Sequence, residues 1–270
     1  MTTLTEHTVT SLQEYTKLVE DLMSRSRQPL WFRGCGDSNH KLIPSLYRHP
    51  EKTNFSDLFS LESEIIARFR ARAIPYCNAV PSDNWDLLFL MQHHGIPTRL
   101  LDWSENPYIS LFFSLTTASY SVVGKTRAFD KDAAVWFLNP NSWNQYALRS
   151  ISFKGGILVT PDRKLNGYKP FSELDEMYNE PVAILGAHNS HRIVAQRGVF
   201  TIFGKDTSPM EDVYKKESFP DDTLLKIILP SSYIESLLNS IRSIGFTDSV
   251  IYPDLDGLAK EMKRIFGYWV

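Results

Sequence analysis

Polar side chains able to do chemistry interrupt two apolar stretches between residues 90 and 114. Gln92 ends an apolar stripe of helical spacing, and Thr98, Arg99 and Asp102 surround the pair Leu100-Leu101. A buried charge or amide is costly unless it is paired. We therefore expect Gln92 to have a specific partner, and we expect Arg99 and Asp102 either to form a buried salt bridge or to bind a ligand.

Arg33 is the candidate for binding an anion. It follows two aromatic residues on an expected strand and precedes Gly34, where a ligand can approach the backbone closely. Its planar guanidinium suits a phosphate or a carboxylate. An internal ion pair with Asp102 or Glu64 explains the same residue equally well, and the two roles are compatible.

Three further polar residues are candidates for the wall of a site. His93 and His94 each offer an imidazole that would serve in acid–base work, line a ligand site or act as a structural donor, and His94 is preferred because it adjoins a Gly-Ile-Pro turn. Gln196 and Thr201 flank Gly198 at an expected strand break. This placement fits a polar site wall, and it also fits an edge-strand bulge whose backbone is satisfied.

The missing motifs argue against several kinds of site. His188 and His191 have no carboxylate at ligand spacing, and Cys35 and Cys77 lie in no CxxC or Cys/His pattern, so we expect no bound metal. The sequence also lacks GxxxxGK[ST], GxSxG, HExxH and GxGxxG. P-loop, α/β-hydrolase, zincin and dinucleotide-binding Rossmann interpretations therefore have no support.

The composition is that of a globular chain. Of 270 residues, 43% are hydrophobic and 22% are charged. The net charge of -2 does not favour broad binding of nucleic acid or of an anionic membrane, and it leaves open a local basic groove for nucleic acid. No segment resembles a secretion signal or approaches the ~20 apolar residues of a membrane span. We expect a cytoplasmic protein without a membrane partner.

Amphipathic helices and short strands must position these residues. Ser11 and Glu14 form a capping-box pattern that predicts a helix over 11–25, and further helices are predicted from Ser56, Asp83, Ser232 and about Asp256. Strands are predicted over 29–34, 133–138, 181–186, 191–196, 198–203 and 224–229. Most of the later strands have no helix between them. We therefore expect an α+β fold, with a central mixed or antiparallel sheet flanked by helices, in one domain over residues 1–270.

The motifs resemble those of FRG-domain proteins. QHHGIPTRLLDWSENPYISLFF at residues 92–113 is similar to the family signature, and Phe32-Arg33-Gly34 matches the tripeptide that gives the family its name. Segments 192–201 and 252–258 fit the family in the same order. The family is similar in distribution to mobile-element and phage-related genes, so the resemblance implies a cytosolic effector of phage-defence or toxin type.

A fainter resemblance concerns the Arg-Ser-Glu type ADP-ribosyltransferases, whose first core strand carries an aromatic-Arg-Gly motif. It implies an ADP-ribosyltransferase-like fold in which Arg33 holds the diphosphate of NAD and Thr98 or Ser104 supplies the hydroxyl of the second motif. In the third motif, Gly198 stands where that family has its catalytic glutamate. Transfer would need Asp102 or Glu64 to stabilise the oxocarbenium-like charge.

The central hypothesis is that the polar residues meet in one cleft. They are Arg33, Gln92, His94, Thr98, Arg99, Asp102 and Gln196, with Thr201 nearby. In the enzyme interpretation the cleft binds NAD as a substrate for ADP-ribose transfer to an unknown macromolecular acceptor, or for NAD hydrolysis, with Asp102, Glu64 or His94 as catalytic groups. In the alternative it belongs to a non-catalytic module that senses a nucleotide, nucleic acid or partner protein. A third interpretation gives the motif a structural role only.

Overall fold

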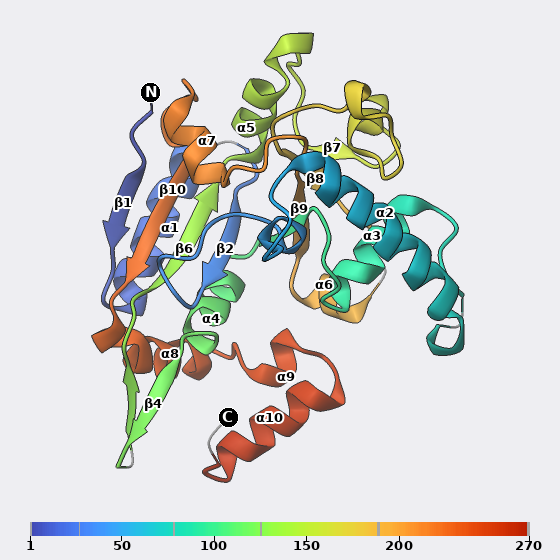
Figure 1. Cartoon of the computed structure of the whole chain (residues 1–270). Coiled ribbons are helices and arrows are strands. Elements are labelled where there is room, and N and C mark those ends of the chain that lie inside the picture. Colours follow the sequence, from blue (N-terminus) through green and yellow to red (C-terminus); the bar gives the residue numbers. More distant parts are fainter. Residues whose placement is uncertain (1, 27, 78, 125, 188–189, 269–270) are drawn as a thin grey trace.

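The computed structural model describes residues 2–26, 28–77, 79–124, 126–187 and 190–268. Its central strands are β1 (Thr5–Thr8), β2 (Trp31–Cys35), β3 (Leu100–Ser104), β6 (Ala133–Leu138), β7 (Leu158–Val159), β8 (Val182–Leu185), β9 (Gly198–Ile202) and β10 (Leu224–Leu229). They form one sheet in the order β1-β10-β6-β2-β3-β9-β8-β7 (Figure 1). Neighbours run antiparallel except at the two edges, where β1 with β10 and β7 with β8 are parallel. The predicted α+β class with a mixed, helix-flanked sheet is confirmed.

The sheet opens between its two middle strands. All five residues of β2 pair with β6, and all five residues of β3 pair with β9. Between β2 and β3 the register consists of Phe32 opposite Ser104. The backbone groups that β2 and β3 turn toward each other are therefore mostly left for side chains to satisfy.

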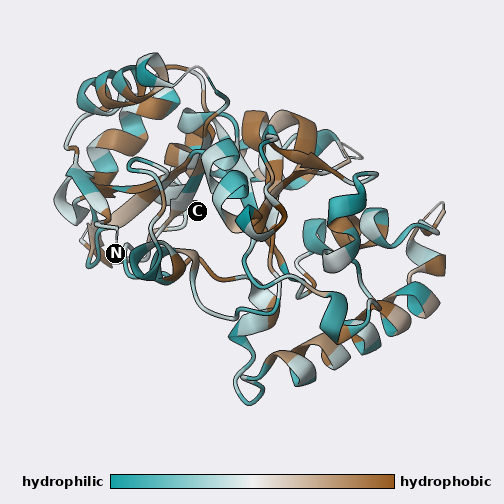
Figure 2. Cartoon of the chain, turned by 90° about the horizontal axis from the view of Figure 1, so that it is seen from above, coloured by the Kyte–Doolittle hydropathy of each residue, from teal (hydrophilic) through white to brown (hydrophobic). Residues whose placement is uncertain are grey.

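Helices cover both faces of the sheet. α1 (Leu12–Arg25), α4 (Pro107–Thr116) and α8 (Ile234–Ser243) form a core with Phe32 and Phe137 on one face. α2 (Phe55–Arg72), α3 (Asn84–His93), α5 (Pro140–Ala147) and α7 (Met210–Lys216) build the core around Trp31 and Trp136 on the other. Trp31 and Phe32 are consecutive in β2, and Trp136 and Phe137 are consecutive in β6. They belong to opposite faces because successive side chains of a strand point to opposite sides of the sheet. Figure 2 shows hydrophobic strands inside and helices that carry both hydrophobic and hydrophilic residues.

The remaining elements lie around this framework. They are α6 (His191–Ala195), α9 (Asp248–Ile251), α10 (Leu255–Ile265), the hairpin of β4 (Tyr120–Val123) and β5 (Thr126–Phe129), and 3₁₀ turns at Ser45–Arg48, Ile74–Tyr76, Arg149–Ile151, Arg163–Tyr168, Leu174–Glu176 and Ser231–Tyr233. In Figure 1, α9 and α10 lie below the sheet. Among the helices of the described ranges, none is long and apolar enough to cross a membrane.

Glycine in the Phe-Arg-Gly tripeptide allows α4 to lie directly on β2. A Cβ atom at Gly34 would stand 2.0 Å from the carbonyl oxygen of Ser110, and one at Gly36 would stand 2.3 Å from the carbonyl of Thr117. Both obstacles are backbone atoms, which cannot move aside as a flexible side chain does. The close packing of strand and helix therefore depends on the absence of a side chain at these positions.

Several local signals locate the elements correctly. The Ser11 hydroxyl caps α1 by accepting from the backbone N–H of Glu14, and the Asp83 carboxylate caps α3. β6 and β10 have the predicted bounds. Gly245 ends α8 with a φ of 98°, which suits glycine after a helix.

One predicted strand and two predicted helix caps are wrong. Residues 191–195 are helical because Ser190 accepts from the backbone N–H of Ile193 and starts α6, where a strand was expected. Asn54 caps α2 in place of Ser56. α8 begins at Ile234 after a 3₁₀ turn, so the expected Ser232 cap is not used. His188 lies outside the described residues, and the single domain over 1–270 stays a prediction.

Candidate functional site

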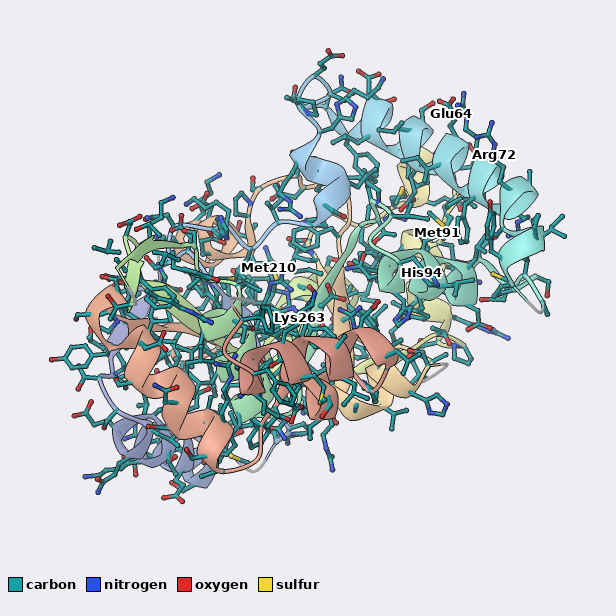
Figure 3. The ribbon with its side chains drawn as sticks, turned by 90° about the horizontal axis from the view of Figure 1, so that it is seen from below. Glu64, Arg72, Met91, His94, Met210 and Lys263 are labelled. Carbon is teal, nitrogen blue, oxygen red and sulfur yellow. The ribbon has the colours of Figure 1, made fainter. Side chains whose placement is uncertain are left out.

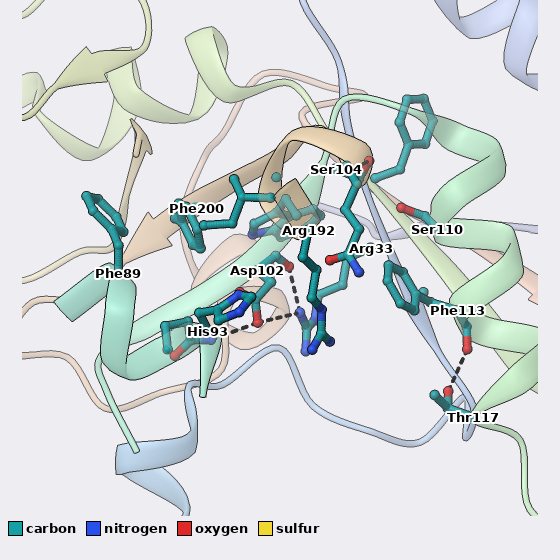
Figure 4. A pocket seen from close by; sticks show the side chains of 17 residues that line it. Arg33, Phe89, His93, Asp102, Ser104, Ser110, Phe113, Thr117, Arg192 and Phe200 are labelled. Atoms are coloured by element: carbon teal, nitrogen blue, oxygen red, sulfur yellow. Dashed lines mark hydrogen bonds and ion pairs between the residues drawn. The ribbon is translucent and has the colours of Figure 1, made fainter. Parts of the chain in front are cut away.

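One cavity opens where β2 and β3 separate, and Figure 4 shows the side chains around it. It has a volume of about 250 Å³ and a wall formed by β2, α3, β3, α4, α6 and β9. Its charged, imidazole and amide side chains are Arg33, Gln92, His93, Asp102, Arg192 and Gln196. Segments distant in the sequence thus meet at the opening of the sheet.

Arg33 spans the opening between the two strands. Its Nη1 donates a 2.6 Å hydrogen bond to the backbone carbonyl of Asp102 and lies 3.9 Å from Oδ2 of the same residue. The guanidinium therefore replaces the missing ladder bond between β2 and β3. A guanidinium has five N–H donors, so it can make further hydrogen bonds beside this one. The Arg33 side chain is 26% exposed, which keeps it within reach from the cavity.

Asp102 is held by a relay of side chains. Gln92 Nε2 donates to Asp102 Oδ2 at 2.7 Å, while Gln92 Oε1 accepts from Thr98 Oγ1 at 2.5 Å. The expectation that Gln92 has a specific partner is confirmed. Thr98 is buried and lies behind the cavity wall, so its influence on a ligand passes through Gln92. The Asp102 side chain is 55% exposed and keeps a free edge toward solvent.

Arg192 and His93 add positive and titratable groups to the opposite wall. The guanidinium of Arg192 stacks on the ring of Tyr252 at 4.8 Å, and within the described part of the chain it has no carboxylate at ion-pair distance. Burial lowers the pKa of His93, and the nearby charges of His94 and Arg192 lower it further. Two guanidiniums and one carboxylate give the cavity a net positive charge at neutral pH.

Gln196 ties the cavity to neighbouring elements. Its side-chain Nε2 donates to the backbone carbonyl of Ile251 at 3.1 Å, and its backbone carbonyl accepts from the Ser104 hydroxyl at 2.7 Å. Glu105 N donates to the carbonyl of Arg197, next to the short strand break. Gln196 thus fixes the position of α6 against β3 and α9 and presents a half-buried polar side chain at the wall.

Aromatic rings form much of the rest of the wall. They are Phe32, Phe89, Trp103, Phe113 and Phe200. Phe89 and Phe200 pack against each other with ring centroids 5.0 Å apart. Flat apolar surfaces beside guanidinium and amide groups suit a ligand that has both a planar ring and an anionic group.

Arg99 has a structural position away from the cavity. It is fully buried, and its Nε donates to both carboxylate oxygens of Glu62 at 2.9 and 3.0 Å. Its two other nitrogens donate to the carbonyls of Phe203 and Tyr168. The expected salt bridge therefore exists with Glu62 as partner and not with Asp102. It joins α2, the start of β3, the end of β9 and the 163–168 turn.

Three other predicted residues also lie outside the cavity. His94 is exposed and lines a separate depression with Phe69 and Tyr76. Glu64 is exposed on α2, where it pairs with Arg68 at 2.6 Å. Thr201 is buried and accepts from the indole N–H of Trp103. The structure thus brings Arg33, Gln92, Asp102 and Gln196 together and leaves His94, Glu64, Thr201 and Arg99 apart.

Sequence reasoning wrongly preferred His94 to its neighbour His93, and it missed Arg192. His93 is the last residue of α3 and follows Gln92 directly, so the helical pattern that indicated Gln92 also placed His93 at the polar end of the helix. Arg192 would have been found only if the segment after Ser190 had been recognised as a capped helix. Within the described residues, no three His, Cys, Asp or Glu side chains cluster in a way that could hold a metal ion.

Comparison with protein families gives a match over the segment that carries the two central strands. Residues 28–121 match the family model of the FRG domain. These residues are an FRG domain. No curated protein and no solved structure matched the chain.

The FRG domain supplies only part of the cavity. Arg33, Gln92 and Asp102 come from the matched segment, whereas Arg192 and Gln196 come from residues beyond it. Gly34 and the α4 segment that packs on it are both inside the match. The Phe-Arg-Gly tripeptide therefore combines two roles: glycine admits the helix, and arginine bridges the opened strands.

Proposed function

We propose that the cavity binds a nucleotide and that the chain acts on NAD as an ADP-ribosyltransferase or NAD glycohydrolase. The observation that carries this proposal is the meeting of Arg33, Arg192 and Asp102 against aromatic walls in one cavity. The two guanidiniums suit phosphate oxygens, and the rings suit a planar base. The carboxylate suits the positive charge that develops on a ribose when its glycosidic bond breaks.

The size of the cavity defines which part of NAD it would hold. A volume of about 250 Å³ is slightly below the range of ligand sites, which usually measure about 300–1,000 Å³. We infer that one half of the dinucleotide, with its ribose and phosphate, enters the cavity. The other half extends past the mouth, where Arg33 meets the diphosphate.

The proposed reaction breaks the bond between C1′ of the ribose and the nicotinamide nitrogen. The bonding electrons leave with nicotinamide, and the carboxylate of Asp102 stabilises the oxocarbenium-like charge left on the ribose. Water or an acceptor side chain then bonds to C1′ and loses a proton to the solvent. Gln92 holds the carboxylate in place through Oδ2.

A second candidate is a non-catalytic nucleotide-sensing module. Two observations favour it: Asp102 already accepts from Gln92 and lies close to Arg33, and Gly198 stands where the resembling transferases have a glutamate. In that case the same residues would bind the nucleotide without cleaving it. Either activity would suit the cytoplasmic effector of phage-defence or toxin type that the family resemblance implies.

The test follows nicotinamide release from NAD by mass spectrometry. We expect the wild-type protein to release nicotinamide and Asp102→Asn to lose at least about 100-fold in rate, the usual scale for a removed electrostatic group. Asp21→Asn, on the exposed side of α1, is the matched control and should retain full activity. Binding of NAD in a calorimetric titration, with no nicotinamide release by any variant, would support the sensing module, and no binding of NAD would refute the proposal that the chain acts on NAD.

A further inference from the structure

A second cavity, here called the arginine cavity, lies between α8, α10 and the β4–β5 hairpin. It has a volume of about 570 Å³, within the usual range of about 300–1,000 Å³ for small-molecule sites. The charged side chains of its wall are Arg127, Glu235, Arg242 and Arg264, and they do not line the nucleotide cavity. Figure 3 shows α10, marked by Lys263 next to Arg264, on the underside of the molecule.

Three separate elements bring guanidinium groups to the arginine cavity. Arg242 comes from the last turn of α8, and Arg264 comes from the last turn of α10. Arg127 comes from β5, where its guanidinium stacks on the ring of Tyr120 at 4.7 Å. Like charges repel one another, so an arrangement that gathers three cations needs compensating negative charge.

Asp248 compensates two of these cations incompletely. Its side chain is 9% exposed, and its Oδ2 lies 3.4 Å from Nε of Arg264 and 3.8 Å from Nη2 of Arg242. A single carboxylate oxygen thus serves two guanidiniums, at distances longer than the roughly 2.7–2.9 Å of a good charged hydrogen bond. Both arginines can therefore donate to a further acceptor.

Arg242 is the cation that most needs such an acceptor. Its Nε is buried and has no hydrogen-bond partner within the described residues. Burial lowers the pKa of Arg242, and the charges of Arg264 and Arg127 lower it further, while Asp248 and Glu235 act in the opposite direction. An anion inside the cavity would stabilise the charged form of this side chain and give its Nε an acceptor.

Glu235 adds a requirement of the opposite kind. It lies seven residues before Arg242 on α8, which places both residues on the same side of the helix. Its Oε2 is buried and has no donor in the part of the chain that the structure describes. Buried polar groups are normally hydrogen-bonded. A ligand that satisfies both side chains therefore carries an anionic group together with a hydrogen-bond donor.

The charges narrow the ligand further. The three arginines carry three positive charges, and Glu235 and Asp248 carry two negative ones, so one positive charge remains. We propose that the arginine cavity binds a small dicarboxylate that also carries an ammonium group, which is the chemistry of an acidic amino acid. The carboxylates bind Arg242 and Arg264, and the ammonium group donates to Glu235. The net negative charge of such a ligand balances the cavity.

Isothermal titration calorimetry with L-glutamate and with glutarate tests the proposal. Glutarate has the same two carboxylates and lacks only the ammonium group, so it leaves Glu235 without a donor. At constant ionic strength, we expect the wild-type protein to bind L-glutamate about tenfold or more tightly than glutarate, the scale of one charged hydrogen bond. Glu235→Gln should remove this preference, because the charge that attracts the ammonium group is gone.

Arginine variants test the binding of the carboxylates. Arg242→Gln and Arg264→Gln should each weaken the binding of L-glutamate about tenfold or more. The Arg264 side chain is 23% exposed, so its variant tests the site even if Arg242→Gln fails to fold. Arg25→Gln, at an exposed position at the end of α1, is the matched control and should bind L-glutamate as the wild-type protein does.

Three results would overturn the proposal directly. They are a wild-type protein that does not bind L-glutamate, equal affinities of the wild-type protein for L-glutamate and glutarate, and unchanged binding of L-glutamate by Arg264→Gln. Inorganic phosphate that binds more tightly than L-glutamate, and loses this affinity in Arg264→Gln, would also overturn it, because the cavity would then be a phosphate site.

Discussion

Replacing Glu62 by glutamine should destabilise the protein far more than the same change at Glu64, two residues away on α2. Glu62 is buried, and both of its carboxylate oxygens accept from Nε of the fully buried Arg99. The amide of glutamine places an NH₂ donor where one of these acceptors stood and removes the charge that compensates the guanidinium. Breaking a buried pair by removing one partner costs about 3–5 kcal/mol.

The matched change Glu64→Gln affects an exposed pair with Arg68, four residues along the same helix. Such pairs contribute about 0.3–0.5 kcal/mol. For a protein of this size, 1 kcal/mol corresponds to about 2–4 °C in Tm, so Glu62→Gln should lower Tm by about 6–20 °C and Glu64→Gln by about 2 °C or less. Differential scanning calorimetry measures both shifts under the same conditions.

The double variant Glu62→Leu with Arg99→Met extends the test. Replacing a buried pair by apolar residues is often neutral, so part of the lost stability should return. The recovery should be incomplete, because the carbonyls of Tyr168 and Phe203 lose the donors that Arg99 supplies. Equal shifts in Tm for Glu62→Gln and Glu64→Gln would refute the assignment of Arg99 as the buried anchor of β3.

Three further outcomes follow from the fold and the cavity. Gly34→Ala should lower Tm much more than Gly198→Ala. The new Cβ at Gly34 would meet a backbone oxygen at 2.0 Å, whereas the nearest atom at Gly198 is a side-chain methyl group at 3.3 Å. A smaller shift in Tm for Gly34→Ala than for Gly198→Ala would contradict the close packing of α4 on β2. Burial lowers the pKa of His93 in the folded protein, so as pH falls below about 6.5 the unfolded state binds a proton first and the wild-type protein loses stability. The Tm of wild type should therefore fall more between pH 7.5 and pH 5.5 than the Tm of His93→Asn. Gln92→Leu should lower the rate of nicotinamide release about tenfold or more by freeing Asp102 Oδ2, and an unchanged rate would remove Gln92 from the positioning role.

Local patterns were enough to predict the fold class and half of the cavity. Capping residues and the two-residue period of strands are signals within a few positions of the element they describe, as the Ser11 and Asp83 caps show. Polar residues that interrupt apolar patterns, such as Gln92 and Asp102, were correctly expected to have partners. Arg33 and Asp102 indeed meet, because their strands are neighbours at the centre of the sheet.

Contacts between distant segments were beyond the reach of these patterns. Nothing near Arg99 in the sequence indicates that its partner is Glu62, which comes from a helix 37 positions upstream. The segment at 191–195 is rich in β-branched and apolar residues, yet the Ser190 cap and the packing of Ile193 make it helical. That error concealed Arg192, because a strand would have sent alternate side chains to opposite faces.

The most direct test of the nucleotide cavity is isothermal titration calorimetry of NAD with the wild-type protein, Arg33→Ala and the matched control Arg68→Ala. Arg68 is an exposed arginine on α2 whose partner is Glu64, away from the cavity. We predict that wild type and Arg68→Ala bind NAD with the same affinity and that Arg33→Ala loses at least about tenfold, as expected when a charged hydrogen-bond donor is removed. Equal binding by Arg33→Ala, or no binding by the wild-type protein, would contradict the central claim.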